Sequence, residues 1–446
     1  MTSELTRRDF LGKAALGTAA ALSARSYAKV IGANDRIRIG FLGCGDRGGG
    51  HRNMVQMSQK EKNLDVAAVC DLWKLNREKA AADCRVKFGG EVKQFKYSED
   101  MLKLPELDAV MIATGDHQHA KILAEVVGAG KHCYCEKPMA IDVEEAKLAR
   151  DAVLKSGRVA QMGSQWVSDP VQRKIRDIVR SGKLGQVTKI EQVWNDNNHR
   201  WHNPDDPDVK AVREEDTDWA RWLLGKPYRP FNPWMYFEFR IFRDFSGGIT
   251  SQWMSHGIGL AHFYTDTAIP DTMVANGGIF AWPDIRQNPD TFQSLATYDD
   301  VKLLYSYSST YGNRFGDYTC IRGKEGTLYA QGGEGSPRWF FIPEQIDDKF
   351  DFFGGFEKAV KRGRAQLVTP DGDTGGLPPT GLSDDSQYHL NDWVDCMRDP
   401  GRKPNGHIHT GFWHSVGAIM ATRAYREGKK MFWDRQKEEI VDHPIV

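Results

Sequence analysis

The sequence predicts an α/β protein whose first domain is built on a parallel, doubly wound sheet. Apolar segments of strand length alternate with helical segments from residue 37 to about residue 157, and this alternation is typical of parallel sheets covered by helices. A second domain is expected because 446 residues exceed what one hydrophobic core usually organises. Lys plus Arg and Asp plus Glu number 60 each, so we expect neither nucleic acid nor an anionic membrane as a partner.

A glycine-rich turn follows the first predicted strand, Ile37 to Leu42. The turn reads Gly43-Cys44-Gly45-Asp46-Arg47-Gly48, and a helix is expected from Gly50 to about Lys60. The first glycine of such a turn permits a tight bend, the second lets the backbone approach a pyrophosphate, and the third allows close helix packing. The helix N-terminus then presents N–H groups to the phosphates. These features predict a dinucleotide-binding Rossmann domain over residues 35–160.

The second predicted strand, Leu64 to Cys70, ends at Asp71. An acidic residue about 20 positions after the glycine turn is placed to hold the hydroxyls of the adenosine ribose. Asp71 therefore favours NAD over NADP, because its carboxylate would repel a 2′-phosphate. Lys74 and Arg77 follow closely, and their positive charges would favour NADP because they attract a 2′-phosphate.

The rest of the first domain continues the same rhythm. Strands are expected at residues 108–114 and 131–135, and helices at residues 120–129 and 142–156, the last capped by Asp142 and ended by Gly157. Ligands of such sheets bind at the carboxyl ends of the strands. We therefore expect the residues at these ends to line the ligand site: Thr114, Glu136 and Lys137.

A polar segment, Asn195 to Pro204, follows a predicted strand at residues 187–194. Two interpretations are open. In one it is a sugar-binding loop, in which Arg200, His199 and His202 contact hydroxyls and Trp201 stacks on a ring. In the other it is a solvated turn. No metal is expected at the two histidines, because no carboxylate or third histidine has the spacing of a ligand.

The remaining chain is expected to form sheet strands at residues 270–345, a long surface loop at 364–384, and amphipathic helices at 388–397 and 410–427. Arg240 and Arg243 either hold substrate oxygens or pair with Asp244 and Glu238, and the ion pairs are the favoured interpretation. The seven cysteines are few and scattered, which favours buried thiols over a disulfide scaffold.

The first 28 residues carry the marks of an export signal. Thr6-Arg7-Arg8-Asp9-Phe10-Leu11 is a twin-arginine pattern, and a short apolar run and Ser26-Tyr27-Ala28 follow it. This order predicts a Tat signal peptide over residues 1–28, the Tat translocon as a partner and a periplasmic protein. The apolar run is too short for a membrane span, so no membrane anchor is expected. Because the Tat route carries folded proteins, a cofactor bound before export is expected.

The segments GCGDRG, VCD, ATGDHQHA and KHCYCEKPMA together resemble the Gfo/Idh/MocA family of NAD(P)-dependent oxidoreductases. Segments of the second half resemble the same family: residues 182–185, residues 218–225, and Ser246-Gly247-Gly248 followed by His256. The resemblance implies a second domain, residues 161–446, with a large open and mainly antiparallel sheet. In the family that sheet commonly packs subunits together, which implies a homo-oligomer.

The resemblance also implies hydride transfer between a sugar-like alcohol carbon and a nicotinamide. Such a reaction needs a cation to hold the alcohol oxygen and a general base to take its proton. By resemblance Lys137 is the cation and His256 the base, but Gln252 stands where the family has an aspartate. The residues expected to bind NAD are Gly43, Gly45, Asp46, Arg47, Gly48, Asp71, Thr114, His119, Glu136 and Lys137.

Two enzymatic functions remain open at this stage. The first is an exported NAD-dependent dehydrogenase of a sugar, glycoside or polyol. The alternative is an NAD-dependent glycoside hydrolase, which oxidises C3 transiently and cleaves the glycosidic bond by elimination. A non-catalytic sugar-binding protein fits poorly with a complete nucleotide fingerprint.

Overall fold

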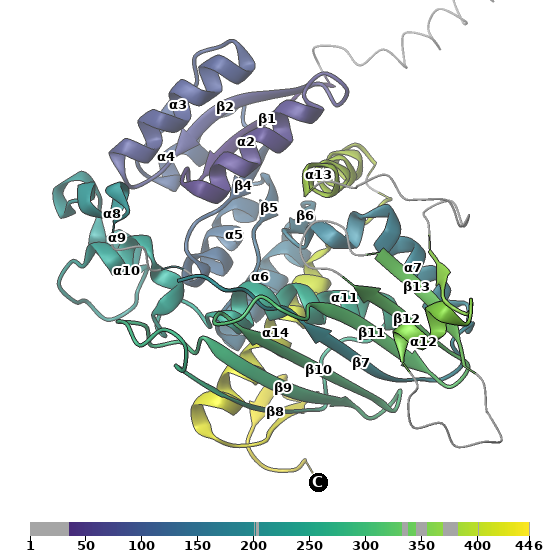
Figure 1. The fold of residues 1–446 in the computed structure, drawn as a ribbon. Coiled ribbons are helices and arrows are strands. Elements are labelled where there is room, and N and C mark those ends of the chain that lie inside the picture. The colour runs from purple at the N-terminus through teal and green to yellow at the C-terminus, as the bar shows by residue number, and fades with distance from the viewer. Residues whose placement is uncertain are drawn as a thin grey trace, which may run out of the picture.

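The computed structural model describes residues 35–199, 201, 205–331, 338–344, 355–368, 382–399 and 401–445. The predicted export signal at residues 1–28 lies outside the described residues, as do Arg200 and His202. The described residues form two sheets, each accompanied by helices (Figure 1). No described helix is both long and apolar enough to cross a membrane.

A six-stranded parallel sheet forms the first domain, in the order β3-β2-β1-β4-β5-β6. The chain starts at β1, builds outward on one side and then returns to build on the other, which confirms the predicted doubly wound sheet. The order reverses between β1 and β4, and ligands bind beyond the carboxyl ends of the strands at such a point. The strands are β1 (Ile37–Leu42), β2 (Leu64–Cys70), β3 (Lys93–Phe95), β4 (Ala109–Ile112), β5 (His132–Cys135) and β6 (Ala160–Met162).

Helices connect these strands and bury the central one on both faces, since every residue of β4 is buried. The first helix begins at Asp46, so the predicted start at Gly50 was wrong. Gly48 therefore lies inside this helix. A Cβ at this position would lie 2.3 Å from the Gly43 carbonyl oxygen, so close packing requires glycine here despite its poor helix propensity. The helices are α2 (Asp46–Ser58), α3 (Lys74–Phe88), α4 (Ser98–Leu102), α5 (His119–Gly128) and α6 (Val143–Ser156).

The second sheet has ten strands in the order β14-β13-β12-β11-β7-β10-β9-β8-β15-β16. Its described pairs are antiparallel except β7 with β10, so the mainly antiparallel sheet is confirmed. β14 (Gln366–Leu367) falls in the predicted surface loop at 364–384; two residues are too few for a sequence pattern. The other strands are β7 (Val187–Val193), β8 (Thr272–Gly278), β9 (Thr291–Tyr298), β10 (Leu303–Thr310), β11 (Tyr318–Gly323), β12 (Gly326–Gln331), β13 (Arg338–Pro343), β15 (Met431–Asp434) and β16 (Glu439–Val441).

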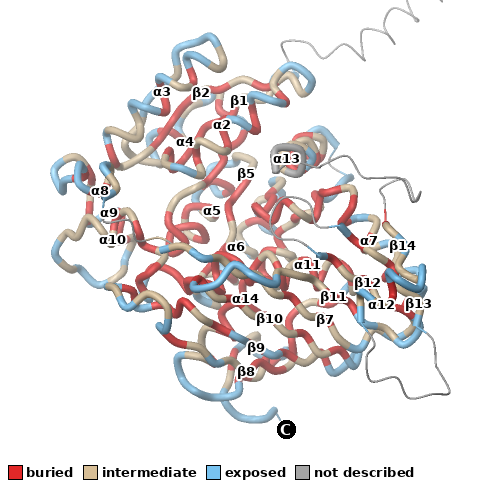
Figure 2. The backbone as a smooth tube through the Cα atoms, viewed as in Figure 1, coloured by how far each residue is buried: buried red, intermediate tan, exposed pale blue. Residues whose placement is uncertain are grey.

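Three helices lie between this sheet and the first domain: α7 (Pro170–Arg180), α11 (Ser255–Thr265) and α14 (Ile408–Glu427) (Figure 1). Burial alternates strictly along β10, as expected of a strand with one face on a core. Tyr305 of β10 shares a buried cluster with Ile258 of α11 and Val416 of α14. Figure 2 shows buried backbone concentrated where these helices meet the sheet.

Helix α13 (Leu382–Arg398) returns to the first domain from the end of the chain. Its residues Leu390, Trp393 and Val394 share a buried cluster with Val55 of α2 and residues of the first sheet. The predicted domain boundary at residues 160 and 161 falls inside β6.

An insertion between β7 and α11 carries the short helices α8 (Pro207–Ala211), α9 (Trp219–Leu223) and α10 (Pro233–Phe237). It packs on the first domain through an aromatic cluster that contains Trp73, Trp222 and Tyr236. The Trp73 and Tyr236 rings meet edge to face with centroids 6.4 Å apart. The insertion therefore covers the first sheet next to the end of β2.

Trp393→Ala should destabilise the protein by about 3–5 kcal/mol, because the substitution removes a large, fully buried side chain from the core of the first domain. Urea unfolding followed by circular dichroism measures the loss. Tyr388→Ala on the same helix is the control; Tyr388 is 48% exposed, and its loss should change the stability by no more than about 0.5 kcal/mol. Equal effects of both substitutions would contradict this role of α13.

Candidate functional site

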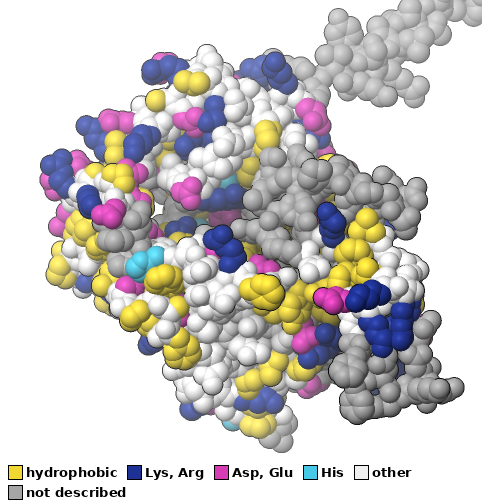
Figure 3. Space-filling view, viewed as in Figure 1, with side chains coloured by type: hydrophobic (Ala, Val, Ile, Leu, Met, Phe, Trp, Pro, Cys, Tyr) yellow, Lys and Arg dark blue, Asp and Glu magenta, His cyan; other side chains and the backbone are white. Residues whose placement is uncertain are grey.

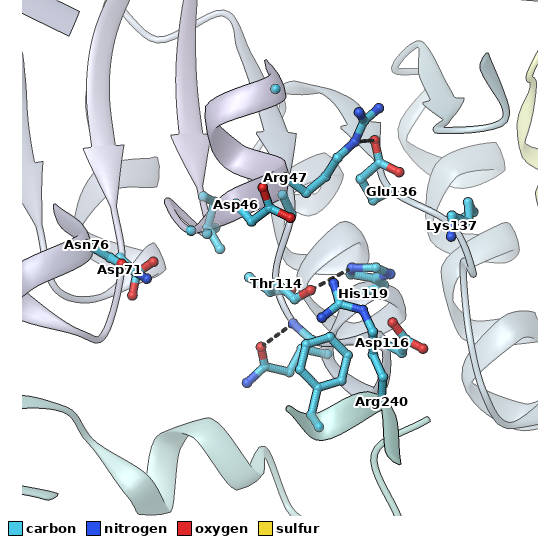
Figure 4. Close-up of a pocket in the computed structure, with 18 of the residues that line it drawn as sticks. Asp46, Arg47, Asp71, Asn76, Thr114, Asp116, His119, Glu136, Lys137 and Arg240 are labelled. Atoms are coloured by element: carbon cyan, nitrogen blue, oxygen red, sulfur yellow. Dashed lines mark hydrogen bonds and ion pairs between the residues drawn. The ribbon is translucent and has the colours of Figure 1, made fainter. Parts of the chain in front are cut away.

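A cavity of about 1420 Å³ lies between the carboxyl ends of the first sheet and the second domain. Figure 3 shows the molecule hollowed between its two parts on this face. In Figure 4, Asp71 and Asn76 lie at one end of the cavity and Asp116, Lys137 and Arg240 at the other. Sites for one small molecule usually measure roughly 300–1,000 Å³, so this cavity has room for a dinucleotide and a second molecule.

The glycine turn lines the middle of the cavity. Gly43 has φ +86, and a Cβ there would lie 2.5 Å from the Ala113 carbonyl oxygen, so only glycine fits the bend. Gly45 is the N-cap of α2 and has no side chain to satisfy the first N–H groups of that helix. These groups are therefore available to a phosphate. Asp46, which follows, also lines the cavity.

Asp71 is held rigidly at the end of β2. Its carboxylate accepts hydrogen bonds from the backbone N–H of Cys44 (2.7 Å) and of Trp73 (2.8 Å), while burial raises the pKa of the carboxyl above its ordinary value. Arg77 donates to the backbone carbonyl of Asp71 over 2.7 Å, so this guanidinium already has an acceptor. The arrangement fits a ribose with free hydroxyls better than one carrying a phosphate.

Thr114 and His119 line the cavity beyond β4. The Thr114 Oγ1 is buried without a hydrogen-bond partner within the described residues, so it offers an unused donor and acceptor to a ligand. His119 does not offer its ring in the same way: Nδ1 lies 2.7 Å from the Pro138 carbonyl oxygen and Nε2 lies 3.2 Å from that of Thr114. The glycine turn, Asp71 and the Thr114 hydroxyl together fit a bound NAD.

Glu136 is buried at the end of β5 and bonds to other residues of the protein. It accepts from Arg47 Nε (2.6 Å), lies 2.9 Å from His51 Nε2 and accepts from Gln165 Nε2 (3.0 Å). Burial opposes its ionisation, but the Arg47 charge and the His51 hydrogen bond hold the pKa of the carboxyl well below its usual range. Arg47 and Glu136 are both predicted cofactor contacts; the structure pairs them with each other at the cavity wall.

Lys137 points into the cavity beside a π-helical turn, η6 (Thr250–Met254), that precedes α11. Its Nζ donates to the Gln252 carbonyl oxygen over 2.6 Å and lies 3.4 Å from Gln252 Oε1. π-turns are common at functional sites. Burial lowers the pKa of Lys137 to about 8, although Glu136 and Asp116 raise it, so the ammonium form prevails at neutral pH.

His256 lines the same cavity one turn after Gln252. Its Nδ1 is buried without a hydrogen-bond partner within the described residues, and its ring packs on Trp166 with centroids 4.9 Å apart. Burial, followed by the charge of Lys137, holds the pKa of His256 well below its usual value. The imidazole is therefore neutral at physiological pH and able to accept a proton.

The predicted sugar-binding segment reaches the cavity in part. His199 and Trp201 line it, but His199 pairs with Asp284 over 2.8 Å and stacks on Trp282 with centroids 4.8 Å apart. The position of His199 is thus fixed by a carboxylate from the connection between β8 and β9. Within the described part of the chain, no three His, Cys, Asp or Glu side chains gather as a metal site requires. The seven cysteines are free and buried, as predicted.

Several residues that the sequence analysis did not place in the site belong to it. Trp166, Trp194 and Trp253 line the cavity, and we call them the indole wall. The rings of Trp194 and Trp253 stack with centroids 4.8 Å apart and planes 8° apart. Trp194 directly follows the β7 strand, and this position was the one signal that could have identified it.

Arg240 also lines the cavity, as the substrate-binding interpretation of this residue requires. Its Nε lies 3.4 Å from Gln252 Oε1. Of the two acidic neighbours, Asp244 pairs with Arg229 over 2.7 Å. Arg243 Nε donates to the Gln287 carbonyl oxygen over 2.8 Å.

Residues 37–164 match the model of a family described as "Oxidoreductase family, NAD-binding Rossmann fold". These residues belong to the Gfo/Idh/MocA family. The Gfo/Idh/MocA domain is therefore an NAD-binding domain, and it contains the glycine turn, Asp71, Thr114 and Lys137.

Similar proteins share more than this domain. Inositol 2-dehydrogenase 2 of Saccharopolyspora erythraea is 29% identical over 191 residues, which are 43% of this chain and 54% of the relative. The rhizopine catabolism protein MocA of Rhizobium meliloti is 30% identical over 152 residues, which are 34% of this chain and 45% of that protein. The chain thus spans about half the length of these curated relatives.

Solved structures resemble the fold over nearly the whole chain. A levoglucosan dehydrogenase in complex with NADH superposes with a TM-score of 0.63 at 16% identity, covering 92% of this chain and all of that one. At this identity the likeness supports the fold of both domains, including the large second sheet.

Asp71→Ala should weaken NAD binding by about tenfold or more, because the substitution removes a charged hydrogen-bond acceptor for the ribose. NADP should lose less affinity, since the repulsion of its 2′-phosphate is removed as well. Titration of both nucleotides by calorimetry measures the ratio. Asp65→Ala on the same strand is the control, and an unchanged NAD to NADP ratio in Asp71→Ala would contradict the assignment.

Proposed function

We propose that this protein is an NAD-dependent oxidoreductase that transfers hydride between a hydroxyl-bearing carbon of a sugar, glycoside or polyol and the nicotinamide. One observation carries the proposal: Lys137 and His256, from different domains, line the same cavity as the glycine turn. A cation and a neutral imidazole next to a nucleotide site are the groups that alcohol oxidation requires.

The proposed chemistry assigns one task to each of these side chains. The Lys137 ammonium donates a hydrogen bond to the alcohol oxygen and stabilises the negative charge that develops on it. His256, whose Nδ1 has no hydrogen-bond partner within the described residues, accepts the hydroxyl proton. Bound NAD supplies the acceptor for the hydride. In the reverse direction the same groups hold a carbonyl oxygen and return the proton.

The indole wall supports a ring-shaped substrate. Flat indole surfaces pack well against the C–H face of a sugar ring, and the polar side chains of Arg240, Gln252 and His199 line the same cavity. The names of the relatives point in the same direction, because inositol and levoglucosan are both cyclic. We therefore propose a cyclic sugar or polyol as the substrate class.

We also propose that the protein is exported by the Tat pathway. The proposal rests on the twin-arginine pattern and the small residues of the first 28 positions. Seven free, buried cysteines are compatible with folding in a reducing compartment before export. The protein is further proposed to form a homo-oligomer through the open face of its second sheet, where the neighbouring Val274 and Leu295 are each 38% exposed.

Lys137→Ala and His256→Ala should each lower turnover by about 10²-fold or more, since each removes a group that stabilises or deprotonates the alcohol. The measurement is NADH formation on a panel of inositol, levoglucosan, glucose and methyl glucosides, with products identified by mass spectrometry. NAD affinity should be retained in both variants. Lys60→Ala, at an exposed position, is the control.

The substrate panel tests the role of His256, the type of reaction and the substrate class. Full activity of His256→Ala would contradict its role as the base. Cleavage of methyl glucosides without net formation of NADH would replace the dehydrogenase by an NAD-dependent glycoside hydrolase. No reaction of the wild-type protein with any cyclic sugar or polyol would contradict the proposed substrate class.

Replacing Arg7 and Arg8 together by Lys should leave the precursor in the cytoplasm, because the Tat route reads the arginine pair. Cell fractionation of the full-length protein in a Tat-competent bacterium measures the distribution. Lys13→Arg in the same segment is the control and should not alter export. Normal periplasmic recovery of the double variant would contradict the proposed route.

A further inference from the structure

Asp116 is a buried carboxylate on the cavity wall that the proposed chemistry does not yet use. It lies in the short turn η2 (Asp116–Gln118) after β4 and is 3% exposed. Its Oδ2 accepts hydrogen bonds from Ser246 Oγ (2.7 Å) and from Gln252 Nε2 (2.6 Å). Both donors belong to the second domain, so this carboxylate joins the domains at the cavity.

The bond to Asp116 fixes the orientation of the Gln252 amide. Because Nε2 donates to Asp116, Oε1 is turned toward Lys137 and Arg240 and lies 3.4 Å from both Lys137 Nζ and Arg240 Nε. The amide is neutral, and it connects an anion on one side with an ammonium on the other. Gln252 is itself 6% exposed, so water competes little for these contacts.

We propose that Asp116 is a positioning residue for Lys137: acting through the Gln252 amide, its carboxylate holds the ammonium toward the second domain and balances its charge. The inference deepens the proposed function, in which Lys137 holds the alcohol oxygen. Position 252 itself carries no charge, so the negative charge on this side of Lys137 comes from Asp116 in the η2 turn of the first domain. The η6 turn, which carries Gln252, and the η2 turn thus build the site jointly.

The charged surroundings of Lys137 make Asp116 important. Two carboxylates, Glu136 and Asp116, favour the ammonium, whereas Arg240 and Arg47 disfavour it. Glu136 is already bonded to Arg47 and His51. The nearby rings of His256 and His414 are neutral, because burial lowers the pKa of both. Without Asp116, the positive charges of Arg240 and Arg47 would still act on Lys137. The carboxylate left to offset them would be Glu136, which also bonds to Arg47 and His51.

Asp116→Asn should therefore make Lys137 lose its proton at lower pH, by about one pH unit. The loss of a negative neighbour disfavours the ammonium, so the sign is downward from about 8. Competitive acetylation of the full-length protein across a pH series, read for the Lys137 peptide by mass spectrometry, measures the titration midpoint with and without NADH. Asp177→Asn, whose side chain is 60% exposed, is the control and should leave the midpoint unchanged.

A charge swap separates this role from a structural one. The double variant Asp116→Asn with Gln252→Asp again has a carboxylate near Lys137, now at position 252 of the second domain. The titration midpoint of Lys137 should therefore rise toward the wild-type value. A merely structural loss would not be reversed in this way. The double variant also keeps the total charge, so it provides the measurement if the single variant fails to fold.

Two results would overturn the proposal. The first is an unchanged titration midpoint of Lys137 in folded Asp116→Asn. The second is a Lys137 midpoint in the double variant that stays below the wild-type value instead of returning toward it. The titration needs no turnover, so its outcome is independent of whether a cyclic sugar is oxidised. Where turnover is measurable, the alkaline fall of kcat/KM should move to lower pH together with the midpoint.

Discussion

The buried carboxylate of Glu136 sets the arrangement of the cavity. It bonds to Arg47 and His51 of α2 and to Gln165 beyond β6, so it ties together three segments that are distant in sequence. An ionised group without water is costly unless partners compensate it, and loss of one partner costs about 3–5 kcal/mol. The same crowding requires Gly163, because a Cβ there would lie 2.6 Å from Glu136 Oε2.

A second buried carboxylate, Asp116, accepts hydrogen bonds from Ser246 and Gln252 of the second domain. Glu136 is bonded to Arg47 and His51 of α2 and to Gln165 just after β6. Lys137 lies between them and is influenced by both. The cavity therefore requires the two domains to be docked, because neither domain alone supplies both the glycine turn and the groups around His256.

The parts of this molecule that follow local rules could be predicted from the sequence. The βα rhythm, the glycine turn and the acidic end of β2 are local. A family resemblance singled out Lys137 and His256, and both line the cavity. The role of Asp116 could not be read in this way, because its partners follow it by more than a hundred residues. The same holds for the indole wall, which converges from three separate segments, and for the contact of Arg240 with the Gln252 side chain, which lies 12 residues further along the chain.

Helix α13 gives the folding of this chain a particular order in time. The first domain is synthesised first, and domains usually fold as units while the rest of the chain is still being made. Here, however, Leu390, Trp393 and Val394 belong to the hydrophobic core of that domain, and they are synthesised more than two hundred residues after β6 (Ala160–Met162). The nucleotide-binding domain therefore completes its core only after α13 has been synthesised, and until then the surface that α13 covers is exposed.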